Sequence, residues 1–316
     1  MSVYTSVSHD TLQTFLSRYE IGDLLNFEGI SAGIENTNYF IYTTQGKYVL
    51  TLFETLGPKE LPYFLNLMAF LAEHQVPSAH PVADNQNQYL QTLQNKPAVI
   101  VHCLQGAEAQ EVTTQHAKAL GAALAKLHLA GQQFEQQQAN SRGPHWWHDT
   151  ITKLEGHIPT QEFKILESEI EFQMTMSHTD LPRGVTHADL FKDNVLWEKG
   201  KISGFIDFYY ACNDVLLYDI AVTCNAWFSD QKGNLNQELS QEFLAQYDRI
   251  RPLNAIEHKA WPVMLRAAAL RFWLSRLNDK YFPKAGELTH LHDPDEFKLI
   301  LMNRIDNHSL FESESF

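Results

Sequence analysis

The segment from residue 186 to residue 207 reads THADLFKDNVLWEKGKISGFID and decides the fold of this chain. Its pattern predicts a loop, a short strand VLW, a turn at a glycine and a second strand ISGFI. Such a hairpin would bring Asn194, which precedes the first strand, near Asp207, which follows the second. Asp189 lies on the loop that leads into the hairpin, so three oxygen-bearing side chains are expected to converge.

Phosphoryl transfer needs oxygen atoms in such an arrangement. Mg²⁺ takes oxygen ligands, typically one or two carboxylates together with phosphate oxygens and water. The acceptor hydroxyl needs a carboxylate that receives its proton. Kinases supply these groups from an Asp, an Asn five residues later and a second Asp that follows a strand. Asp189 is therefore the candidate catalytic base, and Asn194 and Asp207 are candidate metal ligands.

Residues 187–194, HADLFKDN, resemble the HxDxxxxN catalytic loop of the protein-kinase-like superfamily. The closest resemblance is to the aminoglycoside phosphotransferase and choline kinase branch, in which HGDxxxxN is usual. The motif IDF at 206–208 is similar to the metal-binding element of that branch, and LGAALAKLH at 120–128 is similar to its LGxxLAxLH helix. The resemblance implies that His187 orients the catalytic loop and that Asp219, in LYDIA, supports it.

The resemblance implies an α+β, protein-kinase-like fold with a small β-rich N-terminal lobe and a larger, mainly helical C-terminal lobe. The pattern along the chain agrees with this fold. The runs NYFIY at 38–42 and YVLTLF at 48–53 predict a hairpin, and AVIVHCL at 98–104 predicts a buried strand. We therefore expect a nucleotide-binding lobe at 1–103 and a catalytic and acceptor-binding lobe at 104–316.

Helical spacing dominates the remaining pattern. One helix follows the first hairpin, and the C-terminal part is expected to hold helices near residues 114–128, 160–177, 214–228, 238–250 and 263–280. The last helix has a clear start, with Asp293 as N-cap, Pro294 at the first position and Glu296 at the third. This arrangement predicts a variant of the capping box.

The nucleotide site is expected to be built by the first lobe. Residues 29–38 lie where the phosphate-covering loop of kinases belongs, although they contain no GxGxxG motif. Gly33 and Asn36 are candidate contacts to the phosphates, mainly through backbone N–H groups. An ordinary hairpin turn is the alternative. Val101 and Cys103 are expected in the hinge segment that binds adenine through its backbone.

One position departs from the kinase pattern. Protein kinases place a Lys on the strand after the phosphate loop and pair it with a Glu on the next helix. Thr51 occupies the Lys position here and cannot supply the positive charge, but it is kept as a candidate cofactor-binding residue. Lys47, on the same face of the strand, and Glu60 are candidates to replace the pair. For Glu60 the alternative is a surface residue that the helix dipole favours.

Within this branch the chain resembles the bacterial homoserine kinases over nearly its whole length. The matching segments are SAGIENTNY at 31–39, YVLTLFE at 48–54, AAALRFWLSRL at 267–277 and DPDEF at 293–297. The resemblance implies transfer of the γ-phosphoryl group of ATP to the hydroxyl of L-homoserine, on the route to threonine. A carboxylate is bound best by the planar fork of an Arg, and Arg271, between two apolar residues, is the candidate.

Two alternatives remain open. A kinase of the same fold that acts on an aminoglycoside, choline or another amino alcohol would carry the same motifs, and a net charge of −14 suits a cationic acceptor equally well. The Thr at position 51 also permits a catalytically inactive nucleotide-binding scaffold. The intact set of Asp189, Asn194 and Asp207 argues against such a scaffold.

Composition limits the class of protein further. A chain of 316 residues that is 44% hydrophobic can form two lobes with sizeable cores. Its acidity argues against non-specific binding to nucleic acid, which requires clustered Lys and Arg. The sequence shows no apolar run of membrane-spanning length and no secretory signal. With three well-separated cysteines, these features predict a cytoplasmic protein with no membrane partner. The small-molecule substrate is implied by the resemblance.

Overall fold

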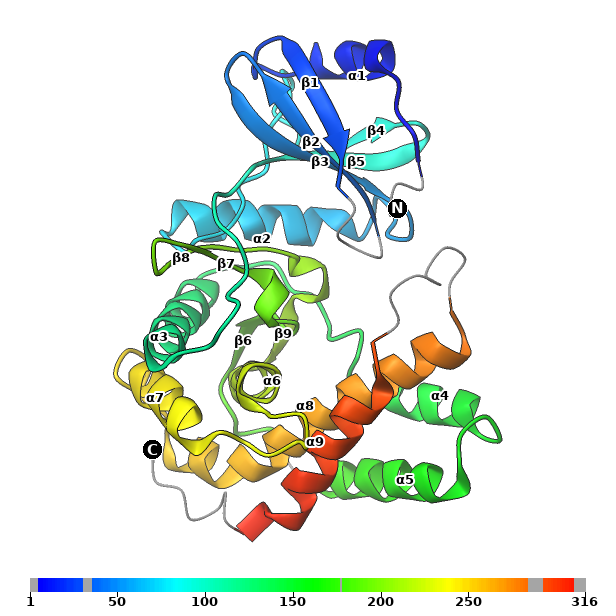
Figure 1. The fold of residues 1–316 in the computed structure, drawn as a ribbon, viewed down its shortest axis with the longest axis vertical. Coiled ribbons are helices and arrows are strands. Elements are labelled where there is room, and N and C mark those ends of the chain that lie inside the picture. The colour runs from blue at the N-terminus through cyan, green and yellow to red at the C-terminus, as the bar shows by residue number, and fades with distance from the viewer. Residues whose placement is uncertain (1–4, 31–35, 177, 284–291, 310–316) are drawn as a thin grey trace. The chain divides into compact units, whose positions relative to one another are not determined.

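The computed structural model describes residues 5–30, 36–176, 178–283 and 292–309 (Figure 1). By its internal contacts the chain divides into two compact units. The first consists of Met1–Gly106 and Ser203–Tyr209, and the second consists of Ala107–Ile202 and Tyr210–Phe316. The lobe boundary expected between residues 103 and 104 stays a prediction.

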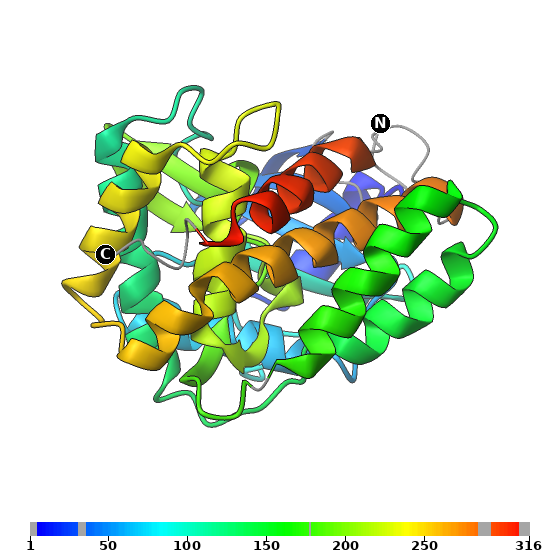
Figure 2. The ribbon, with the colours of Figure 1, turned by 90° about the horizontal axis from the view of Figure 1, so that it is seen from below.

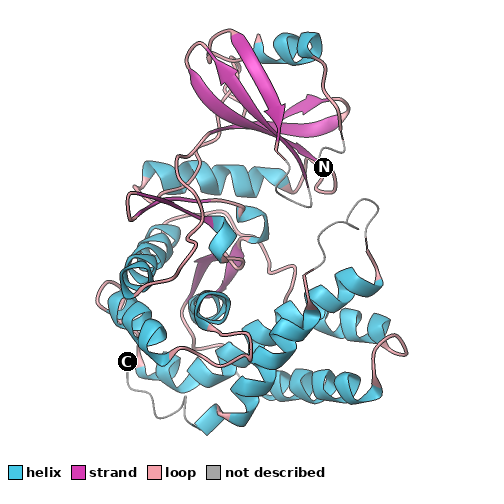
Figure 3. Cartoon of the chain, viewed as in Figure 1, coloured by secondary structure: helices cyan, strands magenta, loops and turns pink. Residues whose placement is uncertain are grey.

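The first unit is built on a five-stranded antiparallel sheet with the strand order β1-β2-β3-β5-β4. Figure 3 shows the strands in magenta. Its helices and strands are α1 (His9–Leu16), β1 (Leu24–Gly29), β2 (Asn36–Thr43), β3 (Gly46–Phe53), α2 (Leu61–Glu73), β4 (Gln91–Leu93) and β5 (Lys96–His102). The expected hairpin is confirmed, because β2 and β3 pair from Thr43 opposite Gly46 to Asn36 opposite Phe53.

One face of this sheet forms a hydrophobic core with α1. Residues of β2 alternate between half-buried and buried, as expected for a strand that has one face on a core. The buried side chains of the strands and of α1 form one cluster that includes Leu12, Phe15, Leu16, Tyr39, Ile41, Leu50, Leu52 and Ile100. The opposite face of β3 therefore presents Lys47, Val49 and Thr51, the face expected for the nucleotide.

The second unit is mainly helical. Its elements are α3 (Thr114–Gly131), α4 (Pro144–Leu154), α5 (Thr160–Thr175), β6 (Arg183–Thr186), the 3-10 turn η1 (Lys192–Asn194), β7 (Val195–Glu198), β9 (Cys212–Val215), α6 (Leu216–Phe228), α7 (Gln237–Asp248), α8 (Ala255–Tyr281) and α9 (Pro294–Asp306). β8 (Lys201–Phe205) and the 3-10 turn η2 (Phe208–Tyr210) cross the division between the units. β6 pairs with β9, and β7 pairs with β8.

Long helices give this unit its framework. α8 runs beside α9, and α4 and α5 pack near it (Figure 2). α3 packs against α7, and α6 packs against α8. Among the described helices, none combines the length and the apolar composition that a membrane crossing requires.

Two details of the predicted helices are wrong. The helix expected at 263–280 begins eight residues earlier, because Asn254 caps it in a capping box with Glu257. Pro262 lies inside this helix. At α9 the N-cap Asp293 is confirmed, but Glu296 does not complete a capping box. Its carboxylate instead accepts a hydrogen bond from Arg276 at 2.5 Å, and Asp293 caps the amide of residue 295.

Candidate functional site

The loop between β6 and β7 brings Asp189 and Asn194 together. The side-chain amide of Asn194 donates to the backbone carbonyl of Asp189 at 2.8 Å and lies 3.3 Å from its Oδ2 atom. Asn194 is buried at the end of the turn η1, and the indole of Trp227 donates to the carbonyl of Leu190 at 2.9 Å. The loop is therefore held at both its backbone and its side chains.

Asp219 holds the other end of this loop. It is fully buried on α6, and its carboxylate accepts hydrogen bonds from the backbone amides of His187 at 2.8 Å and of Ala188 at 2.7 Å. A third bond comes from Nε2 of His128, on α3, at 3.0 Å. The carboxylate of Asp219 thus connects α3 and α6 to the backbone of this loop, and its role as a support of the loop stays a prediction.

The charge of Asp219 follows from these bonds. Burial raises the pKa of Asp219, but hydrogen bonding and charge interactions with His128 and His187 outweigh burial and hold the pKa below its ordinary value. Burial lowers the pKa of His128. An ionised Asp219 can only accept hydrogen bonds, so a neutral His128 carries its proton on Nε2. Its Nδ1 then accepts from the hydroxyl of Tyr247, at 2.6 Å.

The backbone is strained at Ala188, which precedes the candidate base, and at the candidate metal ligand Asp207. Ala188 has φ 62° and Asp207 has φ 63°, a left-handed conformation that costs a residue other than Gly about 1–2 kcal/mol. Strain of this kind persists where the surrounding structure enforces it, and it concentrates at functional sites. At Ala188 the enforcing contact is the hydrogen bond from its amide to Asp219. Asp207 belongs to the first unit, and its convergence with Asp189 stays a prediction.

Arg271 lies beside the candidate base. Its side chain on α8 is 4% exposed, and its Nη1 atom is 3.6 Å from Oδ1 of Asp189. The guanidinium lies over the ring of Phe272, 3.7 Å from the ring centre, and 5.1 Å from that of Tyr210. Its Nε atom is buried and has no hydrogen-bond partner. A buried cation with an unused donor next to a candidate base is what an anionic acceptor would require.

Three of the candidate nucleotide residues, Asn36, Thr51 and Val101, lie on strands of the sheet in the first unit. Gly33 lies outside the described residues. The side-chain oxygen of Asn36 accepts from the amide of Glu54 at 3.4 Å, and Thr51 donates to the side chain of Asn38 at 2.7 Å. Val101 is buried on β5 opposite Val49, and Pro81 forms a bridge with it. The geometry therefore places Thr51 and Val101 on neighbouring strands.

Cys103 follows β5 directly. Its amide donates to the carbonyl of Lys47 at 3.2 Å, so this donor already has a partner within the protein. Burial raises the pKa of the Cys103 thiol, which keeps it protonated. The hinge role predicted for Val101 and Cys103 thus depends on which backbone groups of this segment remain open to adenine.

The two candidates for a replacement Lys–Glu pair have other contacts. Lys47 pairs in register with Tyr42, and its Nζ atom lies 3.5 Å from the ring centre of Phe40. It is at the Cys103 end of β3, about 13 Å along the strand from Thr51. The carboxylate of Glu60 accepts from the amide of Gly57 at 2.9 Å. These contacts favour the surface alternative for Glu60 and give no support to phosphate binding by Lys47.

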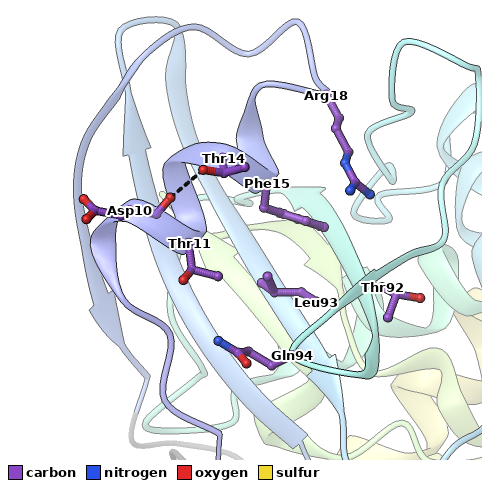
Figure 4. A pocket seen from close by; sticks show the side chains of 8 residues that line it. All are labelled: Asp10, Thr11, Thr14, Phe15, Arg18, Thr92, Leu93 and Gln94. Carbon is purple, nitrogen blue, oxygen red and sulfur yellow. Dashed lines mark hydrogen bonds between the residues drawn. The ribbon is translucent and has the colours of Figure 1, made fainter.

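A hollow in the first unit lies between α1 and the turn from β4 to β5 (Figure 4). Its volume is about 410 Å³, and its lining includes Asp10, Arg18 and Thr92. None of the candidate site residues lines it. No group of three or more His, Cys, Asp or Glu side chains within the described ranges is arranged to hold a metal ion.

Sequence reasoning missed several residues around the catalytic loop. Tyr247 contacts His128 from 119 positions away in the sequence. Tyr210 and Arg142 were also missed, although both lie near Arg271 or its ring neighbours. No local motif marks them, because each is brought to the site by contacts between distant elements. Tyr210 alone had a signal, since it lies three residues after the candidate metal ligand Asp207.

The two-unit architecture is that of a phosphotransferase with a kinase-like fold. A family model described as "Phosphotransferase enzyme family" matches residues 26–253, and the chain belongs to this family. Solved structures confirm the fold. An amicoumacin kinase superimposes with a TM-score of 0.71 at 17% identity, covering 97% of this chain and 93% of that chain. The choline kinase of Cryptosporidium parvum gives 0.70 at 13% identity, with 97% and 98% covered.

Curated relatives include homoserine kinases from several bacteria. A homoserine kinase from Methylobacillus flagellatus is 48% identical over 305 residues, which is 96% of each chain. A homoserine kinase from Neisseria meningitidis serogroup B is 43% identical over 303 residues, covering 96% of this chain and 99% of the relative. The expected resemblance to the bacterial homoserine kinases is therefore confirmed over nearly the whole chain.

Proposed function

We propose that this chain is an ATP-dependent homoserine kinase, which forms O-phospho-L-homoserine and ADP. The observation that carries the acceptor is the buried guanidinium of Arg271, 3.6 Å from the carboxylate of Asp189. L-homoserine has both a carboxylate and a primary hydroxyl, so this pair can bind one group and deprotonate the other. Identity of 48% over 96% of a curated homoserine kinase supports the same acceptor.

The chemistry follows from the positions of the loop residues. Asp189 accepts the proton of the acceptor hydroxyl. At the same time the hydroxyl oxygen bonds to the γ-phosphorus, and the bond from that phosphorus to the β–γ bridging oxygen breaks, which releases ADP. Asn194 and Asp207 would hold Mg²⁺, and their amide and carboxylate oxygens are donors that this ion prefers. The amide nitrogen of Asn194 faces Asp189, which leaves its oxygen for the ion. When bound, the ion would supply charge neutralisation at the phosphates.

The nucleotide is proposed to lie against the sheet of the first unit. Gly33 and Asn36 would contact the phosphates, while Thr51, Val101 and Cys103 would contact the rest of ATP. The side chains of Asn36 and Thr51 are neutral and cannot supply the positive charge of the missing Lys. Backbone N–H groups and the metal would therefore carry the interactions with the phosphates. We also propose a cytoplasmic location, which agrees with the separated cysteines and the small-molecule substrate.

A panel of acceptors tests this function. Purified protein with Mg-ATP is expected to release ADP fastest with L-homoserine, and more slowly with choline, ethanolamine and an aminoglycoside. Product identity is checked by mass spectrometry of O-phosphohomoserine. A higher kcat/KM for any other acceptor would reject homoserine, and no transfer to any acceptor would favour the scaffold alternative.

Replacing Arg271 with alanine is expected to raise the KM for L-homoserine by about 10- to 100-fold, because the substrate carboxylate loses a charged hydrogen-bond donor. The KM for ATP should change little. Steady-state kinetics with each substrate varied in turn measures both constants. A homoserine KM equal to that of the wild type would remove Arg271 from the acceptor site.

A further inference from the structure

The segment before α4 is fixed to β9 by a set of hydrogen bonds. The backbone amide of Gln138 donates to the side-chain oxygen of Asn213 at 2.8 Å. The backbone amide of Asn213 donates back to the carbonyl of Gln138, also at 2.8 Å. The side chain of Asn140 donates to Asp214 at 2.6 Å and accepts from the amide of Arg142 at 2.8 Å. The Gln-rich stretch therefore ends in a rigid turn that places Arg142.

The side chain of Arg142 lies among aromatic rings. Its guanidinium carbon is 4.5 Å from the ring centre of Trp146, in the first turn of α4, and 5.6 Å from that of Tyr210. Its Nε atom is buried without a hydrogen-bond partner. No carboxylate of the described residues forms an ion pair with Arg142, and its position next to aromatic faces is one that guanidinium groups favour.

Arg142 and Arg271 share one neighbour. Both guanidinium groups lie over the ring of Tyr210, at 5.6 Å and 5.1 Å from its centre, and both have a buried, unused Nε donor. Two cations near one ring repel each other, so an anion that accepts from both would relieve the repulsion. A carboxylate has about four acceptor positions and can accept from two guanidinium groups.

We propose that Arg142 is a specificity residue, which binds the carboxylate of the acceptor together with Arg271 over the ring of Tyr210. This inference rests on the proposed function and extends it, because it explains how the site selects an amino acid over a simple amino alcohol. Arg271 lies within 3.6 Å of Asp189, so a carboxylate held by the two Arg residues keeps the acceptor close to the base. Arg142 acts on binding and not on proton transfer.

The test compares two acceptors that differ only in the carboxylate. L-homoserine and 3-aminopropan-1-ol share the hydroxyl, the chain and the ammonium group. The variant Arg142→Met is expected to lower kcat/KM for L-homoserine by about 10- to 100-fold and to leave that for 3-aminopropan-1-ol unchanged. Arg142→Lys keeps the charge without the planar fork and should lose less. Arg249→Met, at an exposed position on the C-terminal side of α7, is the control.

The outcomes separate this inference from the proposed function. If the wild type prefers 3-aminopropan-1-ol to L-homoserine, the proposed function fails, and the inference fails with it. If the wild type prefers L-homoserine and Arg142→Met keeps that preference, only the role of Arg142 is rejected. Equal losses with both acceptors would also reject it, because they indicate a structural defect. Should Arg142→Met fail to fold, the preference of Arg142→Lys decides the question by the same criterion.

Discussion

Replacing Asp189 with asparagine is expected to lower kcat by about 10²- to 10⁴-fold, the usual contribution of a positioned general base. Asparagine keeps the shape of the side chain and its contacts with Asn194, but it cannot accept the hydroxyl proton. The KM for L-homoserine should change much less than kcat, because Asp189 acts mainly as the bond to phosphorus forms. Initial-rate ADP release at saturating Mg-ATP measures both constants.

The same loop provides a control for this variant. Asp193 is exposed and lies four residues away, so Asp193→Asn removes an equal charge without touching the reaction. Its kcat is expected to stay within about twofold of the wild type, as for a surface substitution away from the site. If Asp189→Asn kept the activity of Asp193→Asn, Asp189 would not be the base, and the mechanism proposed for this chain would be wrong.

The approach of Asp189 and Asn194 could be predicted because the two residues are close in sequence. Asp189 and Asn194 are five positions apart, and a short loop before a strand is enough to bring them within hydrogen-bonding distance. Asp219 was proposed from the resemblance. Its carboxylate accepts hydrogen bonds from two loop amides, and its role stays a prediction. The resemblance also predicted the two lobes, and the β-rich start of the chain and the helical spacing after residue 110 agreed with it.

Other features depend on contacts that no local pattern contains. The Gln-rich stretch before Arg142 has the composition of a surface connection, yet Asn213, 75 positions later, fixes it in place. The start of α8 was missed because the capping pair Asn254 and Glu257 lies upstream of Pro262. Thr51 was placed correctly on its strand, but the sequence could not show that its hydroxyl is bonded to Asn38.

The strained Ala188 illustrates how the family pattern and the structure explain each other. The HGDxxxxN pattern that this loop resembles has Gly at this position, and Gly adopts positive φ without a steric penalty. Here Ala188 has φ 62°, and its amide donates to Asp219 at 2.7 Å. The energy of that buried bond offsets the strain, so the loop keeps its conformation without a glycine. The loop therefore depends on Asp219 more than a loop with Gly would.

This dependence leads to the second large expected effect. Replacing Asp219 with asparagine should destabilise the protein by about 3 kcal/mol, because the buried donors of His187, Ala188 and His128 lose an ionised acceptor that bonds to all three. The catalytic loop would lose its support, so kcat should fall as well. Urea unfolding followed by tryptophan fluorescence gives the change in unfolding free energy, and the kinetic assay gives kcat.

Asp230 supplies the matched comparison for this variant. Its carboxylate also accepts three hydrogen bonds, from the amides of Lys232 and Asn234 and from the side chain of Asn234, but it is exposed. Asp230→Asn should therefore cost far less than Asp219→Asn, since water can replace its bonds.

The same measurement tests whether the low pKa of Asp219 keeps its carboxyl ionised in the native protein. If Asp219→Asn cost less than about 1 kcal/mol, the native carboxyl would be protonated, because asparagine replaces a neutral acid with little loss.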